Sequence, residues 1–239
     1  MSDTRKCSFP PLPASTSDPD VIRANDWTAF REVDSLHSHW AVKNWPPGRS
    51  GLYWYLTFDN PELTSLAARC QGHLESSDID PVPPTGLHIT LLGLGDTDSL
   101  STEELVTVAD LTSEKLTDID PFELHIGPIT GSRSAIRLSV APWDPLLDLH
   151  RVLRECAARV LPGIRLSETS SFRPHMGIGY LNRRQGAADL IAEVSRLRDL
   201  PPVPVLVRQV HLVELWRAGH RYRWSDRAVV PLRDRPHTT

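Results

Sequence analysis

The chain has 239 residues, of which 40% are hydrophobic and 23% charged, and its formal net charge is -4 at pH 7. This composition predicts a soluble globular protein with a sizeable core, and it argues against a disordered chain or a protein that binds long nucleic acid through excess positive charge. The sequence contains no apolar run of membrane-spanning length and no N-terminal secretory pattern, so we expect a cytoplasmic protein with no membrane contact.

The first 50 residues precede the predicted folded body. Four prolines among Ser and Asp are typical of a mobile tail, and Asn25 can cap a helix that extends to about Leu36. The tryptophans and prolines that follow predict an irregular collar. We therefore expect four parts: an N-terminal tail (1–20), the collar (21–50), the main domain (51–230) and a C-terminal tail (231–239).

Strand and helix patterns then alternate. Leu52–Phe58 predicts a strand whose even-numbered apolar residues share one face, with Tyr53 and Tyr55 on the other. Further predicted elements are the helix Pro61–Glu75, the strand Leu87–Leu94, a helix from a Ser101/Glu104 capping box to about Thr117, the hairpin strands Phe122–Ile129 and Ala135–Val140, the helix Asp144–Val160, the strand Pro174–Leu181, the helix Gln185–Leu197, and the strands Val203–Trp216 and Arg221–Val230.

Such interleaving with short connections indicates α/β or α+β sheets with helices on one face. The opposite faces of two such sheets could meet and enclose a cleft. The blocks that contain His88 and His175 suggest a diverged duplication, because each histidine lies in a short apolar strand after a proline-containing loop.

These two histidines are the main catalytic candidates. In a strand, residues i and i+2 share a face, so His88 is expected beside Thr90, and His175 beside Gly177 and Gly179. Glycine leaves room for a ligand to approach the backbone. Two imidazoles suit a reaction that takes one proton from a nucleophile and gives another to a leaving group. The alternative for either histidine taken alone is a half-buried polar residue.

The segments Gly86–Leu91 and Phe172–His175 resemble those of the 2H phosphoesterase superfamily, and within it the 2'-5' RNA ligase-like proteins. The resemblance covers about residues 51–230. It implies an α+β, bilobal fold with two pseudo-symmetric lobes of mainly antiparallel sheet, helices on the outer faces and a cleft between. It also implies metal-independent, cofactor-free chemistry on 2',3'-cyclic phosphates or 2',5'-phosphodiesters.

By position, the resemblance makes His88 and His175 catalytic and Thr90 a phosphate contact. Members have Thr or Ser two residues after the second histidine, where this chain has Gly177. Backbone at Gly177 and the side chain of Arg173 are therefore expected near the phosphate, and Ser170, Ser171 or a water are other sources of the missing contact.

Three side chains are candidate substrate contacts. Tyr53 and Tyr55 could stack on a base, with plain packing as the alternative. Arg137 could bind phosphate, with a surface position as the alternative. His125 and His211 are expected to be structural.

The expected function is hydrolysis of a small nucleotide or short RNA-like substrate, with no obligate protein partner evident. A nucleotide-binding module with little turnover is the alternative raised by Gly177. An RNA-binding accessory protein is a third interpretation, because all basic residues after 150 are Arg. The isolated cysteines predict neither disulfides nor a thiolate zinc site.

Overall fold

The computed structural model describes residues 10–74, 76 and 78–233. The helices are α1 (Pro19–Arg31), α2 (His39–Lys43), α3 (Pro61–His73), α4 (Thr102–Leu116), α5 (Asp144–Val160) and α6 (Ala188–Arg196), with short 3-10 turns η1 (Pro84–Gly86), η2 (Thr97–Ser99) and η3 (Thr169–Ser171). The strands are β1 (Ser35–Leu36), β2 (Ser50–Thr57), β3 (Ile79–Pro81), β4 (His88–Asp96), β5 (Phe122–Gly131), β6 (Ala135–Ala141), β7 (Met176–Leu181), β8 (Gln185–Gly186), β9 (Val203–Val207), β10 (Gln209–Arg217) and β11 (Tyr222–Pro231).

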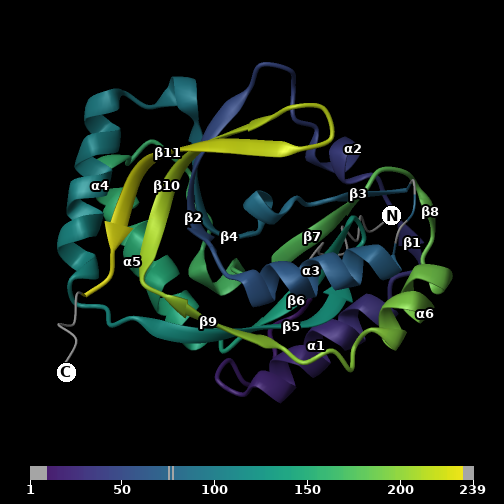
Figure 1. Cartoon of the computed structure of the whole chain (residues 1–239). Helices are drawn as coiled ribbons and strands as arrows, with labels where there is room; N and C mark the ends of the chain where they lie inside the picture. Colours follow the sequence, from purple (N-terminus) through teal and green to yellow (C-terminus); the bar gives the residue numbers. More distant parts are fainter. Residues whose placement is uncertain (1–9, 75, 77, 234–239) are drawn as a thin grey trace, which may run out of the picture.

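The strands form two main sheets, one in each half of the molecule (Figure 1). The four-stranded sheet has the order β11-β10-β2-β4 and the five-stranded sheet the order β3-β7-β6-β5-β9, and β1 pairs with β8. All neighbouring strands are antiparallel. Helices α4 and α5 contact the first sheet, and α3 and α6 the second. The expected α+β bilobal architecture is confirmed.

Strand β2 shows how the sequence orients a sheet. Leu52, Trp54 and Leu56 are buried in the core, as the alternating pattern predicts. Tyr53 and Tyr55 therefore point to the other face, into the space between the two sheets. The apolar pattern thus determines which side chains reach a cleft.

Local capping patterns define the central helices. Ser101 and Glu104 form the predicted capping box of α4, and α5 has the predicted bounds. Asn60 caps α3 by accepting from the backbone N–H of Leu63. The predicted end of α3 at Glu75 lies outside the described residues. No helix in the described ranges has the length and apolar character that a membrane crossing requires.

The N-terminal region differs from the sequence-based expectation. Helix α1 begins at Pro19 rather than near Asn25, because the Asp18 side chain accepts hydrogen bonds from the N–H groups of Asp20 and Val21. The helix packs on β5 and β6. Residues 1–9 of the expected N-terminal tail and residues 234–239 of the expected C-terminal tail lie outside the described residues.

The segment Val203–Trp216 forms two strands, so the prediction of a single strand is wrong. Strand β9 pairs with β5 in the five-stranded sheet, whereas β10 pairs with β2 and β11 in the four-stranded sheet. Only Arg208 separates the two strands, so no Gly or Pro marks the point where one ends and the other begins. The chain passes here from one half of the molecule to the other.

Candidate active site

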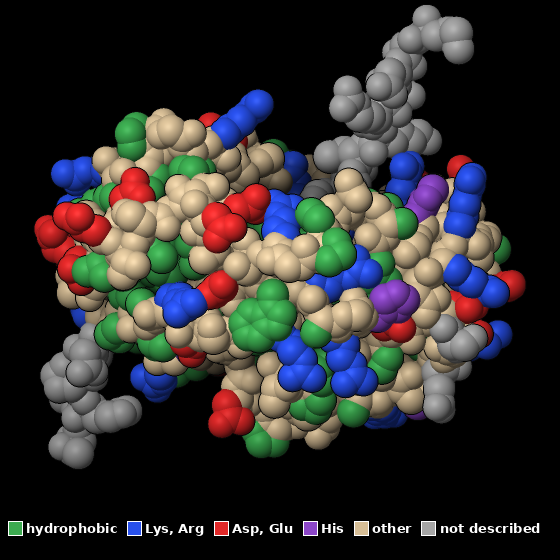
Figure 2. Space-filling view, turned by 90° about the horizontal axis from the view of Figure 1, so that it is seen from above, with side chains coloured by type: hydrophobic (Ala, Val, Ile, Leu, Met, Phe, Trp, Pro, Cys, Tyr) green, Lys and Arg blue, Asp and Glu red, His purple; other side chains and the backbone are tan. Residues whose placement is uncertain are grey.

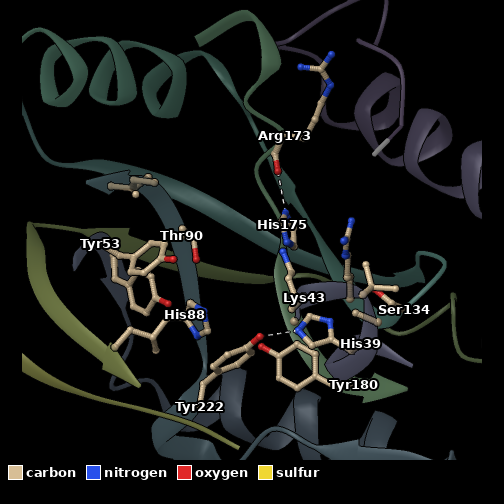
Figure 3. Close-up of a pocket in the computed structure, with 18 of the residues that line it drawn as sticks. His39, Lys43, Tyr53, His88, Thr90, Ser134, Arg173, His175, Tyr180 and Tyr222 are labelled. Carbon is tan, nitrogen blue, oxygen red and sulfur yellow. Dashed lines mark hydrogen bonds between the residues drawn. The ribbon is translucent and has the colours of Figure 1, made fainter. Parts of the chain in front are cut away.

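A pocket of about 410 Å³ lies between the two sheets. Side chains from β2, β4, β6, β7, β11, α2 and the loop around η3 line it. His88 and His175 both belong to this lining. Figure 3 shows their rings, with His88 at the start of β4 and His175 directly before the facing strand β7. The structure thus brings together the two histidines singled out in the sequence.

The ring of His88 is held by one hydrogen bond and by aromatic packing. Its Nδ1 donates to the carbonyl oxygen of Gly86 at 2.8 Å. Tyr55 stacks on the ring at a centroid distance of 4.3 Å, and the Trp224 ring packs edge-on at 5.2 Å. Because Nδ1 carries the proton of the neutral ring, Nε2 is the basic nitrogen.

His175 repeats this arrangement in the other half of the molecule. Its Nδ1 donates to the carbonyl oxygen of Arg173 at 2.8 Å (Figure 3). In both cases the acceptor lies two residues before the histidine, at the start of a short strand. The shared geometry supports the duplicated blocks inferred from the sequence and selects the same tautomer on both sides.

Both imidazoles favour the neutral form in the unliganded protein. Burial lowers the pKa of His88 to about 4, although the hydrogen bond to Gly86 acts in the opposite direction. Burial also lowers the pKa of His175 well below its usual range, and the positive charges of Arg137 and Lys43 add to this. A bound anion would raise both pKa values by favouring the imidazolium forms.

The other candidates on the His88 side lie where the strand pattern predicts them. Thr90 lines the pocket beside His88 and lies close to the Tyr55 hydroxyl. Tyr53 and Tyr55 line the same wall, with ring centroids 5.9 Å apart. This wall therefore combines one imidazole, the Thr90 hydroxyl and the two tyrosines.

On the His175 side, Gly177 lines the pocket as expected. The expectation that Gly179 shares this face is wrong. Arg137 pairs with Gly177 and Ile136 with Gly179, which leaves Ile178 as an extra residue in a β-bulge. After the bulge the alternation is reversed. Tyr180 consequently lines the pocket, whereas Gly179 lies at a different surface hollow.

Arg137 is a buried pocket residue and not a surface arginine. It is 8% exposed, and its pKa is lowered by burial to about 10, while Asp26 and Tyr180 act to raise it. The guanidinium therefore stays charged near neutral pH. Asp26, from α1, lies beside Arg137 and Ser139 on one face of β6, and both act to lower the pKa of its carboxyl against the larger effect of burial. Helix α1 thus supports the pocket side of the five-stranded sheet.

Arg173 does not turn its guanidinium toward the histidine pair (Figure 3). Its side chain donates to the carbonyl oxygens of Pro10, Ser170 and Phe172. Arg173 instead positions His175 through its own carbonyl oxygen. This placement gives no support to the expected phosphate contact of its side chain.

Sequence reasoning missed several pocket residues, among them His39, Lys43, Tyr180 and Tyr222. His39 and Lys43 come from α2, within the expected collar, and Lys43 lies near His175 in Figure 3. Tyr222 and His39 are hydrogen-bonded at 3.0 Å. The two glycines within β7 were a usable indication of the bulge that redirects Tyr180, because strand glycines often mark bulges. No pattern in residues 39–43 indicated a site.

The pocket has a cationic, carboxylate-free lining. None of the described residues that line it is Asp, Glu or Cys. Across the described part of the chain, no three His, Cys, Asp or Glu side chains gather as metal ligands would. In Figure 2, acidic side chains gather toward the α4 end, while Lys and Arg side chains surround the middle of the face. This arrangement is suited to an anion and not to a metal ion.

The remaining histidine candidates lie elsewhere. His211 is paired with Asp226 at 3.1 Å and His125 with Glu123 at 3.2 Å, and neither lines the pocket. Both positions agree with the structural roles expected for them.

Comparison with solved structures supports the fold. The crystal structure of LigT from Escherichia coli in apo form aligns with a TM-score of 0.57 and 21% identity, covering 78% of this chain and 99% of LigT. LigT complexed with 3'-AMP aligns with a TM-score of 0.53 and 22% identity over the same shares. TT0787 of Thermus thermophilus aligns with a TM-score of 0.57 and 18% identity, covering 77% and 98% of the two chains.

Sequence comparison identifies the family to which the chain belongs. No curated protein matches the chain. A family model described as the 2'-5' RNA ligase superfamily matches residues 60–219, which include both histidines and more than half of the chain. The chain therefore belongs to the 2'-5' RNA ligase superfamily of 2H phosphoesterases.

Proposed function

We propose that this protein is a metal-independent phosphodiesterase that hydrolyses a 2',3'-cyclic or 2',5'-linked nucleotide or short oligonucleotide. The observation that carries the proposal is the pair of equivalent imidazoles, each fixed through Nδ1 to the carbonyl two residues earlier, on one pocket. This arrangement gives one phosphate a general base and a general acid.

The two histidines have different electrostatic surroundings, which supports different roles. Arg137 and Lys43 lie on the His175 side and disfavour its imidazolium form. We therefore assign the general base to neutral His175, which takes a proton from water as the water oxygen bonds to phosphorus. Protonated His88 gives its proton to the leaving oxygen as the phosphorus–oxygen bond breaks. The products are a phosphate monoester and a hydroxyl group.

The pocket walls support a nucleotide as the substrate. Thr90 and Arg137 offer a hydroxyl and a guanidinium to the non-bridging oxygens, which gain charge in the transition state. Tyr53 is half-buried at the edge of the aromatic wall, where a base could stack on it. LigT has been crystallised with 3'-AMP, ATP and NADP+, which agrees with a nucleotide ligand on this fold.

The alternative is a nucleotide-binding module with little turnover, which the absence of a hydroxyl at Gly177 favours. A panel of 2',3'-cyclic mononucleotides and 2',5'-linked dinucleotides separates the two by liquid chromatography of the products. We expect turnover of at least one substrate class. Submicromolar binding with no product from any member of the panel would instead support the binding module.

Activity should survive removal of divalent cations. The histidines have no carboxylate or thiolate beside them among the described pocket residues, so charge neutralisation depends on Arg137, Lys43 and hydrogen-bond donors. We expect kcat in excess EDTA to stay within about twofold of its untreated value. Loss of activity in EDTA that zinc or manganese restores would overturn the proposed mechanism.

The pH profile of kcat/KM should have its maximum below pH 6.5. The active free enzyme needs one proton on the histidine pair, and the pKa values of both histidines are lowered, that of His88 to about 4. Above both pKa values the singly protonated fraction falls about tenfold per pH unit. The alkaline limb of kcat should lie at higher pH, because bound substrate favours the imidazolium. Initial rates between pH 4 and 9 test this, and a kcat/KM that stays constant to pH 9 would contradict it.

A further inference from the structure

The β-bulge at Ile178 brings the Tyr180 hydroxyl to the place where the family pattern requires a different hydroxyl. A Cβ built on Gly177 would lie 3.4 Å from the Tyr180 Oη and 3.5 Å from its Cε1. The oxygen of a serine or threonine at position 177 is one bond beyond that Cβ. The Tyr180 hydroxyl therefore lies close to the volume that the missing Ser or Thr oxygen would fill.

We propose that Tyr180 supplies the second phosphate-binding hydroxyl, so that its Oη donates to a non-bridging oxygen opposite Thr90. This inference rests on the proposed phosphodiesterase function and names a catalytic group that the family pattern places elsewhere. Thr90 follows His88 by two residues, and Tyr180 follows His175 by five. The bulge and the longer side chain together make up the difference.

The surroundings of Tyr180 suit a neutral donor. Burial raises its pKa to about 12, so the hydroxyl keeps its proton near neutral pH. No residue in the described part of the chain accepts a hydrogen bond from it, so the proton is available to a ligand. His39 packs on the ring at a centroid distance of 4.2 Å, and Tyr222 packs edge-on at 5.5 Å. These contacts fix the direction of the hydroxyl (Figure 3).

The other side chains that the sequence offered as a replacement donor are either hydrogen-bonded elsewhere or absent from the pocket lining. Ser171 donates its hydroxyl proton to the carbonyl oxygen of Glu168 at 2.7 Å, and Ser170 is not part of the pocket lining. The Arg173 side chain is bound to three backbone carbonyl oxygens. Tyr180 is thus the hydroxyl donor best placed beside His175.

The test is a set of paired substitutions assayed on a 2',3'-cyclic nucleotide. Tyr180→Phe keeps the ring and removes the donor, so kcat should fall by about 10²- to 10³-fold. The double variant Tyr180→Phe/Gly177→Ser should have a kcat at least tenfold higher than that of Tyr180→Phe alone, because the serine provides a hydroxyl in the same place. Adding Gly177→Ala, which provides the Cβ without the oxygen, should restore nothing.

If the Tyr180 ring served only for packing, Tyr180→Phe would keep the wild-type kcat. That result would overturn the inference. Equal effects of Gly177→Ser and Gly177→Ala in the Tyr180→Phe background would overturn it as well. Thermal unfolding should show the same melting temperature for Tyr180→Phe as for the wild type.

If the wild type turns over no substrate, the proposed function fails and the tyrosine is tested by binding. Titration with inorganic phosphate should then give a Kd that is about tenfold higher for Tyr180→Phe, since a hydrogen bond to a charged group is lost. An unchanged Kd would refute the assignment of Tyr180 independently of catalysis.

Discussion

His88→Asn and His175→Asn should each lower kcat by about 10²- to 10⁴-fold, the usual worth of a positioned acid or base. Asparagine is chosen because its Nδ2 can replace Nδ1 as donor to the carbonyl oxygen of Gly86 or Arg173. The substitution therefore keeps the anchoring hydrogen bond and removes only Nε2. Steady-state rates at saturating substrate, together with circular dichroism, separate lost chemistry from lost folding.

His125→Asn is the matched control, because His125 lies in a strand and outside the pocket. Its kcat should equal that of the wild type. If either His88→Asn or His175→Asn also retains the wild-type rate, that histidine has no role in proton transfer. The combined variant should be little slower than the worse single variant, because the two groups act as a unit.

Thr90→Val should lower kcat by about 10²- to 10³-fold with a smaller effect on KM. Valine is nearly isosteric with threonine and suits the strand, so the change removes the hydroxyl and little else. A preorganised donor to a developing oxyanion contributes about 2.7–4 kcal/mol in the transition state. The loss should therefore appear in the rate more than in ground-state binding.

Thr90→Ser should retain most of the activity, since it keeps the hydroxyl. Thr107→Val on the exposed side of α4 serves as the control for a threonine outside the pocket. A rise in KM with unchanged kcat for Thr90→Val would mean that the hydroxyl contributes only to uniform binding, and its assignment to the transition state would then be wrong.

Short-range patterns were enough to predict much of the fold. The capping box of α4, the Pro residues in the first turns of α3 and α5, and the alternation of β2 each involve neighbours within a few residues. Such patterns set local structure directly. The start of α1 was missed because the Asp18 side chain, rather than that of Asn25, caps the helix, and Pro19 is its first residue.

The missed features depend on pairing between distant segments. The break between β9 and β10 is set by the sheet that each strand joins, and no Gly or Pro marks it at Arg208. The face of Tyr180 is set by a bulge in β7 opposite β6. A prediction based on strict two-residue alternation therefore assigns Tyr180 to the wrong face. His39 and Lys43 reach the pocket because α2 contacts β7. The histidine pair, in contrast, lay within recognisable strand motifs.

The most direct test of the central proposal is hydrolysis of a 2',3'-cyclic nucleotide in water enriched in oxygen-18, with excess EDTA present. Mass spectrometry of the product reports both turnover and the origin of the new oxygen. We expect a phosphate monoester with one labelled oxygen per phosphorus, and only background product from the His88→Asn/His175→Asn variant. A wild-type protein that binds the nucleotide and returns it unchanged, or a double variant that forms labelled product at the wild-type rate, would contradict the proposal.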